Sequence, residues 1–266
     1  MKLFKNRFLT GVLLVSATAM LAGCGKSNAA GAGPSVTDDG VLVVGLAVGE
    51  DRSSFKSVDD DGNVIYDGIE PEVLAYYSSR YPDVQLQYVY ANSNEELLTK
   101  LSAGEIELAA GGFTMLDSYK QEYVLSNSYG YGNLYLVNKK DTYIDSLTAY
   151  TDKNIGVMNS IPLSALSNIP GIDAVVQQNY DSRTVLADDI GGDVVAAGVC
   201  LERDAAYLLD TGKYSVSEIS GGPQVSLCFL LPSGQSGFAG VLNSVIADYL
   251  DYKALGTLDQ QMSQSE

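Results

Sequence analysis

The chain of 266 residues contains no histidine. Histidine is the side chain that most often acts as a general base near neutral pH, and it is also the most common metal ligand. Cysteine is scarce as well, with three residues and no CxxC pair. A zinc site or a cysteine–histidine nucleophile is therefore unsupported, and we expect no catalytic residue, metal or cofactor.

Basic residues are few, and their shortage limits the partners. Residues 1–23 hold three basic residues and no acidic one, so the rest of the chain carries 13 Lys and Arg against 33 Asp and Glu, a formal charge of 13 minus 33, or −20. Such a surface repels nucleic acid and anionic head groups, which excludes nucleic-acid partners. A hydrophobic content of 46% argues against general disorder.

Long apolar runs are also missing, apart from one at the N-terminus. Lys2, Lys5 and Arg7 make the start of the chain positive, and Phe8–Leu21 is apolar but short for a membrane span, as in a secretory signal. The segment Leu21–Cys24 resembles the lipobox of bacterial lipoproteins. This resemblance implies cleavage after residue 23, palmitate or another acyl chain on Cys24, and an extracytoplasmic protein that is lipid-anchored to the cell membrane. The alternative is an ordinary signal peptide with a chance cysteine.

After a Gly- and Ala-rich tether at 24–39, strand and helix patterns alternate. The Val-rich run at 41–46 is typical of a strand buried on both faces. We expect further strands at 84–89, 106–110, 154–158, 175–176, 194–199, 214–217 and 227–231, and helices at 70–77, 94–103, 163–166, 203–209 and 237–255. This alternation predicts an α/β fold with two lobes and right-handed crossovers.

Two local features lead to separate predictions. Ser93 and Glu96 form a capping box, in which each side chain accepts from the other's backbone N–H, and the helix that follows stops at Gly104. Cys200 and Cys228 lie in apolar runs, so they either form a disulfide or remain buried thiols.

The order of several motifs resembles the extracellular solute-binding proteins of family 3, which serve polar amino-acid ABC transporters. The stretches that carry the resemblance are Leu42–Gly45, Phe55, Asp59–Gly62, Gly68–Val73, Leu97–Leu101, Ala103–Leu108, Gly112–Thr114, Ser126–Tyr129, Leu134–Val137, Asn154–Val157, Val194–Val199, Ala205–Leu209 and Gly256–Asp259. They cover nearly the whole chain after Cys24.

This resemblance implies a type II periplasmic-binding-protein fold with two crossover hinge strands. Lobe 1 is expected at 40–136 plus 230–266, and lobe 2 at 137–229. The lobes would close over a small solute, and a monomer would deliver it to ABC permease subunits in the membrane.

The same resemblance places an α-carboxylate site at Gly112, Phe113 and Thr114. In the family this site is a helix N-terminus, where backbone N–H groups favour an anion. Thr114 would cap that helix and offer its hydroxyl to the ligand; alternatively it is only the cap.

The charged groups of the family's ligand clamp are not found. An ungapped alignment puts Tyr119, with Lys120 beside it, where the family has arginine, and lysine offers a point charge instead of a fork. Where the family often has Gly-Thr or Thr-Thr, this chain has Ser160-Ile161-Pro162. The acid that grips the amine is expected at 198–201, where no residue is acidic; Glu202 and Asp204 would need a shifted alignment.

Substitutes for the clamp lie in nearby segments. Arg52 would supply the missing positive charge, or it is a solvated loop cation paired with a neighbouring acid. Phe55 and Phe113 would line the cleft or belong to the core. Three tyrosines near the first crossover are weaker candidates for the cleft: Tyr129, Tyr131 and Tyr135.

Three functions follow in order of preference. The first is a binding protein for a small polar solute, an amino acid or related compound. The second is a binding-only sensor or interaction module with a degenerate cleft. The third is an enzyme, which would have to use carboxylates such as Glu70 or Asp204 as acid and base.

Overall fold

The computed structural model describes residues 40–47, 55–58 and 64–263, with side chains at 40–47 and 68–254. Cys24, Arg52 and the side chain of Phe55 lie outside the described residues. Among the helices that are described, none has the length and apolar character that crossing a membrane requires.

The first sheet is built around parallel strands near the N-terminus. Its order is β4-β1-β5-β13-β6, and β7 also pairs with β13. β1 is parallel to β4 and β5, whereas β13 runs antiparallel to β5, β6 and β7. The strands are β1 Val41–Ala47, β4 Gln85–Ala91, β5 Leu108–Thr114, β6 Tyr123–Leu125, β7 Gly130–Gly132 and β13 Val225–Pro232.

The second sheet has the order β10-β9-β11-β8-β12. β9 is parallel to β10 and β11, and β8 is antiparallel to β11 and β12. Its strands are β8 Leu134–Lys139, β9 Asn154–Met158, β10 Val176–Tyr180, β11 Ala197–Leu201 and β12 Tyr214–Glu218. A separate antiparallel ribbon joins β2 Phe55–Val58 and β3 Val64–Asp67.

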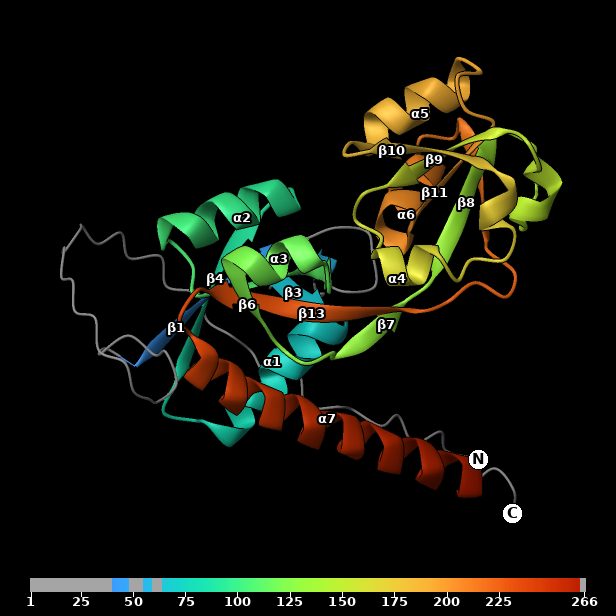
Figure 1. The fold of residues 1–266 in the computed structure, drawn as a ribbon. Coiled ribbons are helices and arrows are strands. Elements are labelled where there is room, and N and C mark those ends of the chain that lie inside the picture. Colours follow the sequence, from blue (N-terminus) through green and yellow to red (C-terminus); the bar gives the residue numbers. More distant parts are fainter. Residues whose placement is uncertain (1–39, 48–54, 59–63, 264–266) are drawn as a thin grey trace. The chain divides into compact units, whose positions relative to one another are not determined.

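The helices divide between the two sheets, and we call each sheet with its helices a lobe (Figure 1). The first lobe holds α1 Ile69–Arg80, α2 Asn94–Ala103, α3 Asp117–Glu122 and α7 Ser236–Ser263. The second lobe holds α4 Leu163–Leu166, α5 Arg183–Gly191 and α6 Glu202–Asp210, with 3₁₀ turns at Leu147–Tyr150 and Ile172–Ala174.

The chain passes between the sheets twice. It leaves the first sheet at β7 and enters the second at β8, then returns between β12 and β13. The boundaries expected above, at 136/137 and 229/230, remain a prediction about which segments move together.

Each sheet buries apolar side chains on both faces. On the first sheet, α1 and α7 cover one face, where Tyr77 meets Phe238 edge-on at 6.1 Å between ring centroids. Leu97 and Leu101 of α2 pack on the other face. On the second sheet, α5 and α6 cover one face, with Leu186 fully buried. A fully buried Leu or Phe side chain contributes about 1.5–3 kcal/mol.

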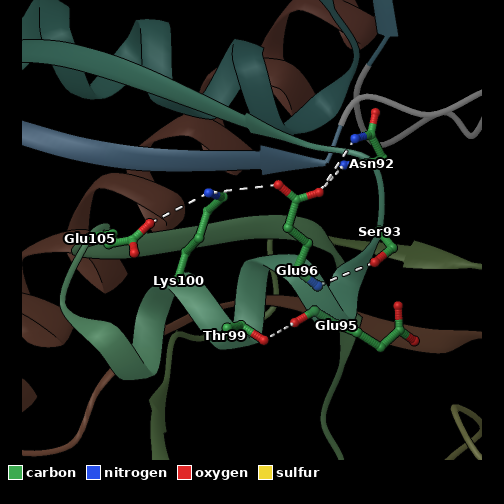
Figure 2. Close-up of polar contacts among 7 residues, drawn as sticks. All are labelled: Asn92, Ser93, Glu95, Glu96, Thr99, Lys100 and Glu105. Atoms are coloured by element: carbon green, nitrogen blue, oxygen red, sulfur yellow. Dashed lines mark hydrogen bonds and ion pairs between the residues drawn. The ribbon is translucent and has the colours of Figure 1, made fainter. Parts of the chain in front are cut away.

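The polar contacts around helix α2 show which residues cap its first turn (Figure 2). Ser93 Oγ accepts the Glu96 N–H at 3.2 Å, and Gly104 ends the helix with φ 72°. The reciprocal half of the predicted capping box is wrong: Glu96 Oε2 accepts from the Asn92 N–H at 3.0 Å instead of from Ser93. The other oxygen of this carboxylate, Oε1, lies 3.7 Å from Lys100 Nζ.

Two predicted strands end further along the chain in the structure than their apolar runs indicated. The strand expected at 106–110 is β5, which runs to Thr114 and is buried throughout. The strand expected at 194–199 is β11, Ala197–Leu201. In both cases hydrogen bonds to neighbouring strands extend the ordered backbone toward the carboxyl end, past the apolar run that indicated the strand.

Cys200 and Cys228 are free thiols, and both are buried. They lie on different sheets, in β11 and β13. Burial raises the pKa of the Cys200 thiol well above its ordinary value and that of Cys228 to about 12. Of the two alternatives, buried thiols are the ones observed.

Candidate binding site

A cavity of about 770 Å³ lies at the carboxyl ends of the parallel strands of both sheets. Ligands of open α/β sheets bind at this edge, because the loops that follow the strands meet there. The lining residues are the last residues of β1, β5, β9 and β11, or they follow β4, β5, β9 and β10 and lie at the start of the helices after the strands. The polar ones are Asn92, Ser93, Asn94, Glu95, Thr114, Ser118, Tyr119, Asn159, Ser160, Asp181, Ser182, Arg183, Thr184, Arg203 and Asp204.

Most of the site residues expected in the described part line this cavity. They are Gly112, Phe113, Thr114, Tyr119 and Ser160. Lys120 is not among the lining residues: its ammonium pairs with Asp117 at 2.8 Å on the exposed side of α3. Arg52 and the side chain of Phe55 lie outside the described residues.

The expectation that Thr114 caps a helix is wrong. Thr114 is the last residue of β5, and α3 begins at Asp117 with Leu116 at the N-cap position and no side-chain cap. The Thr114 hydroxyl donates to the Ser160 carbonyl at 2.6 Å. This bond joins the first lobe to the second at the cavity wall, so Thr114 and Ser160 are neighbours.

Tyr119 brings an aromatic ring to the position expected for the family's arginine. Its ring meets Phe113 edge-on at 5.7 Å and Tyr123 at 6.3 Å. Burial raises the pKa of the Tyr119 hydroxyl, although the charge of Arg203 lowers it in part. A neutral phenol at this place cannot form the bidentate clamp that arginine forms on a carboxylate.

Two adjacent glycines shape the end of β5. A Cβ on Gly111 would come within 2.5 Å of Asn94 Oδ1, and Gly112 has φ +61°. The Gly112 N–H donates to Glu70 Oε1 at 2.9 Å, and the Tyr129 hydroxyl donates to the same oxygen at 2.5 Å. Glu70 is fully buried and does not line the cavity. Its carboxylate therefore holds the cavity wall in place from behind.

The second lobe supplies a cluster of charges that the sequence analysis did not assign to the site. Asp204 is 4% exposed, and its Oδ1 lies 3.6 Å from Arg183 Nη1 and 3.6 Å from Arg203 Nε. Arg203 Nη1 also donates to the Gly111 carbonyl at 3.0 Å. The Arg183 guanidinium carbon lies 3.7 Å from the centroid of the Tyr207 ring.

Two further carboxylates line the same cavity. Burial raises the pKa of Glu95, but hydrogen bonds from its own backbone and Ser93, with the charges of Arg203 and Arg183, outweigh it, so the pKa is lowered overall. Glu95 is therefore ionised at neutral pH. Asp181 Oδ1 accepts from Asn159 Nδ2 at 2.7 Å. The lining thus carries three carboxylates and two guanidinium groups.

Three buried acceptor atoms of the cavity residues have no hydrogen-bond partner within the described part of the chain. They are Asn94 Oδ1, Ser160 Oγ and Asp204 Oδ2. An unsatisfied buried polar atom is costly and rare, so each calls for a water molecule or a ligand group. Asn94 Oδ1 and Asp204 Oδ2 accept hydrogen bonds, and the Ser160 hydroxyl can accept or donate one, so the wall is complementary to a molecule with N–H or O–H donors.

The missed residues carried a recognisable signal. Arg183 and Arg203 each lie in the first turn of a helix, where the helix dipole disfavours a cation. α5 was not predicted at all, although Ser182 caps it and Leu186, Ala187 and Ile190 lie on one face. A break of a local rule at the carboxyl end of a parallel strand indicates a functional position.

The three tyrosines have separate places. Tyr129 is fully buried, and Tyr135 is half-buried against the second-lobe core. Tyr131 is 64% exposed and lines a second cavity of about 360 Å³, which shares Gly112, Leu201 and Arg203 with the first. Within the residues that the structure describes, no cluster of three His, Cys, Asp or Glu side chains is placed to hold a metal ion.

Residues 44–262 match the sequence model of the bacterial extracellular solute-binding proteins, family 3. The chain belongs to this family. The predicted family membership is confirmed, and with it a solute-binding role and, since the family is extracellular, an extracytoplasmic location.

Named relatives agree with this assignment. The arginine-binding extracellular protein ArtP of Bacillus subtilis (strain 168) is 28% identical over 148 residues, which are 55% of this chain and 54% of the relative. The match thus spans about half of that relative's length.

Solved structures share the fold. The amino-acid ABC transporter substrate-binding protein AbpA from Streptococcus pneumoniae Canada MDR_19A, bound to L-arginine, has a TM-score of 0.59 at 16% identity, covering 85% of this chain and 95% of that one. AncCDT-1, an ancestral amino acid-binding protein and precursor of cyclohexadienyl dehydratase, has a TM-score of 0.56 at 18% identity, covering 86% and 96%. The two-lobed type II fold is confirmed.

Proposed function

We propose that this protein is the lipid-anchored substrate-binding component of an ABC importer that captures a small polar solute, an amino acid or related compound, and delivers it to a membrane permease. The observation that carries the proposal is the cavity between the lobes, with charges of both signs and three unpartnered acceptors in its wall. A zwitterion with extra N–H donors satisfies such a wall. A relative named as arginine-binding supports this class of ligand.

Transport requires that the ligand favours one arrangement of the lobes. The expected lobes, 40–136 with 230–266 and 137–229, both contribute to the cavity wall. A ligand that contacts both lobes stabilises their closed arrangement in proportion to its greater affinity for it. The permease then recognises that arrangement of a monomeric binding protein.

A thermal-shift screen of the full chain tests the binding role. The panel is the twenty common amino acids, polyamines, short peptides and small organic acids, with the D-enantiomer as control for each chiral amino acid that binds. A ligand at a hundredfold excess over its Kd stabilises the folded state by about 2.7 kcal/mol, so its Tm shift is readily measured. A clear shift with an L-amino acid supports the proposal, and no shift with any compound overturns it.

The lipid anchor has its own test. The basic start, the apolar run and Leu21–Cys24 support cleavage before Cys24 and acylation of its thiol. Labelling of cells with radioactive palmitate should mark the wild-type protein and not Cys24→Ser, which should also appear in the medium. Equal labelling of both proteins would contradict the anchor.

A second candidate function is a binding-only sensor or interaction module. Tyr119 favours it, because a phenol replaces the charged group that holds a carboxylate in the family, and it packs against Phe113. Turnover has less support: Glu70 is buried behind the wall, so of the two carboxylates considered only Asp204 lines the cavity. A substrate-turnover screen with cyclic carboxylates checks that the protein is not an enzyme.

A further inference from the structure

Arg183 and Asp204 form the part of the second lobe in which a positive and a negative group face one cavity. Arg183 is the first residue of α5, and Asp204 is the third residue of α6. Their closest charged atoms, Nη1 and Oδ1, are 3.6 Å apart, beyond hydrogen-bond distance. The two groups therefore attract each other while Asp204 Oδ2 is left unpartnered.

The position of Arg183 is unfavourable by itself. A cation at the start of a helix opposes the positive end of the helix dipole. The Tyr207 ring lies 3.7 Å below the guanidinium carbon and holds the group in place, and the Arg183 side chain is still 32% exposed. A carboxylate bound by Arg183 would also meet the start of α5, and it would relieve this unfavourable placement.

Asp204 Oδ2 calls for the opposite partner. The side chain is 5% exposed, the residue lines the cavity, and the oxygen is an acceptor without a donor. An ammonium group supplies that donor and the balancing charge. An α-amino acid carries an ammonium and a carboxylate on the same carbon, and it matches the two neighbouring groups.

We propose that the second lobe alone grips the head group of the amino acid: Arg183 binds the α-carboxylate and Asp204 binds the α-ammonium. This inference rests on the function proposed above and places the carboxylate site in the second lobe, whereas the family resemblance implies a carboxylate site in the first lobe and only the acid for the amine in the second. Arg203 is a positioning residue, because its Nη1 is engaged by the Gly111 carbonyl and its Nε faces Asp204.

The first lobe then selects the ligand's side chain. Asn94 Oδ1 is an unpartnered buried acceptor at the start of α2, and the ionised Glu95 lies beside it. Asn94 Nδ2 is already used, since it donates to the Gly111 carbonyl at 3.0 Å. These two groups favour a side chain that ends in an N–H donor, either an amide or a cation.

The test combines variants of the full chain with altered ligands. Titration calorimetry uses the tightest binder among the twenty L-amino acids, its α-carboxamide and its N-acetyl derivative. Arg183→Gln should lower the affinity for the amino acid about 10- to 100-fold, as expected for a lost charge-assisted hydrogen bond. It should change the affinity for the carboxamide little. Asp204→Asn should remove the preference for the free amine over the N-acetyl derivative.

Arg80→Gln is the matched control. Arg80 pairs with Asp248 and lies over Tyr76 at 5.9 Å, so it repeats the Arg–Asp–Tyr set at a place that does not line the cavity. Its affinity for the amino acid should equal that of the wild type. Arg183→Gln carries the test if Asp204→Asn fails to fold.

The outcomes separate this inference from the proposed function. Amino-acid binding that Arg183→Gln leaves unchanged overturns the inference and keeps the function. Binding of only a polyamine or another solute without a carboxylate also overturns the inference and keeps the function. A wild-type protein that binds no compound of the panel overturns both. A loss in Arg183→Gln that is confined to ligands with a free carboxylate supports the inference.

Discussion

The two lobes contribute different chemistry to one cavity. The first lobe builds its part of the wall from Gly112, Phe113, Thr114 and Tyr119, of which Phe113 and Thr114 are almost fully buried, and Glu95 is its carboxylate. The second lobe presents Asp181, Arg183, Arg203 and Asp204. The difference shows that similarity of fold and distribution of charge can separate: the motifs of both lobes resemble the family, while both guanidinium groups of the cavity wall lie in the second lobe.

The largest expected effect is on stability, and it compares how much the apolar core of each lobe contributes to the free energy of unfolding. Phe238→Ala in the first lobe should lower the free energy of unfolding by about 3–5 kcal/mol, and Leu186→Ala in the second by about 2–5 kcal/mol. Both side chains are fully buried. Urea denaturation followed by circular dichroism measures both changes.

Tyr143→Ala, at a side chain that is 77% exposed, is the control and should change stability little. A loss below about 1 kcal/mol for either core variant would contradict the core assignment, because buried large-to-small changes cost more than that.

The second prediction concerns Gly111 of the first lobe, whose carbonyl accepts a hydrogen bond from Arg203 of the second lobe. Gly111→Ala places a Cβ 2.5 Å from Asn94 Oδ1 and 2.9 Å from Leu97 Cδ1. Overpacking of this kind should lower the free energy of unfolding by about 1–3 kcal/mol. It should also lower the affinity for the ligand, because the Gly111 carbonyl accepts a hydrogen bond from Arg203. Calorimetric titration and thermal unfolding measure the two effects.

Gly240→Ala serves as the control for the glycine substitution. Gly240 lies in α7, and a Cβ there meets nothing within 4 Å. Alanine should therefore stabilise the helix by about 0.5–1 kcal/mol without changing ligand affinity. Equal effects of the two glycine substitutions would show that Gly111 has no special place in the wall.

A smaller effect compares the helix caps that border the cavity in each lobe. Ser93 Oγ accepts the Glu96 N–H at 3.2 Å, and Ser182 Oγ accepts the Val185 N–H at 3.5 Å. Ser93→Ala should cost about 0.5–2 kcal/mol, and Ser182→Ala less, since its bond is longer. Denaturant titration gives both values. A larger loss for Ser182→Ala would reverse this ranking of the two caps.

The smallest expected effect is the pH dependence of stability that comes from Glu72 in the first lobe. Partial burial raises the pKa of Glu72, but hydrogen bonds from Lys253 and Tyr249, both at 2.6 Å, outweigh it and leave the pKa below its ordinary value of 4.5. A lowered folded-state pKa stabilises the protein above about pH 4.5, and this contribution disappears as the pH falls through the folded-state pKa.

The corresponding experiment compares wild type with Glu72→Gln across pH 3 to 7. The difference in Tm should be constant above about pH 5 and should shrink as the pH falls, because both proteins then carry a neutral side chain. A difference that grows on acidification would contradict the lowered pKa.

Part of the second lobe's site could not be found by aligning motifs. No residue at 198–201 is acidic; these residues end β11, and the acidic side chain that lines the cavity next to them is Asp204, the third residue of α6. An ungapped comparison fixes a residue's distance along the chain, but the helix turn brings the third residue of α6 back toward the strand end. The spacing alone does not show which side chain of that turn lines the cavity.

The sequence by itself determined the family, the two α/β lobes and the places of most strands and helices. These depend on local patterns, such as the valine-rich run of β1 and the Ser93 cap, whose physical causes lie within a few residues. Only the tertiary structure decided that Arg183 and Asp204 face one cavity and that Thr114 contacts Ser160. The reason is that these groups come from separate strand ends, which meet only when the sheets have formed and the helices have packed.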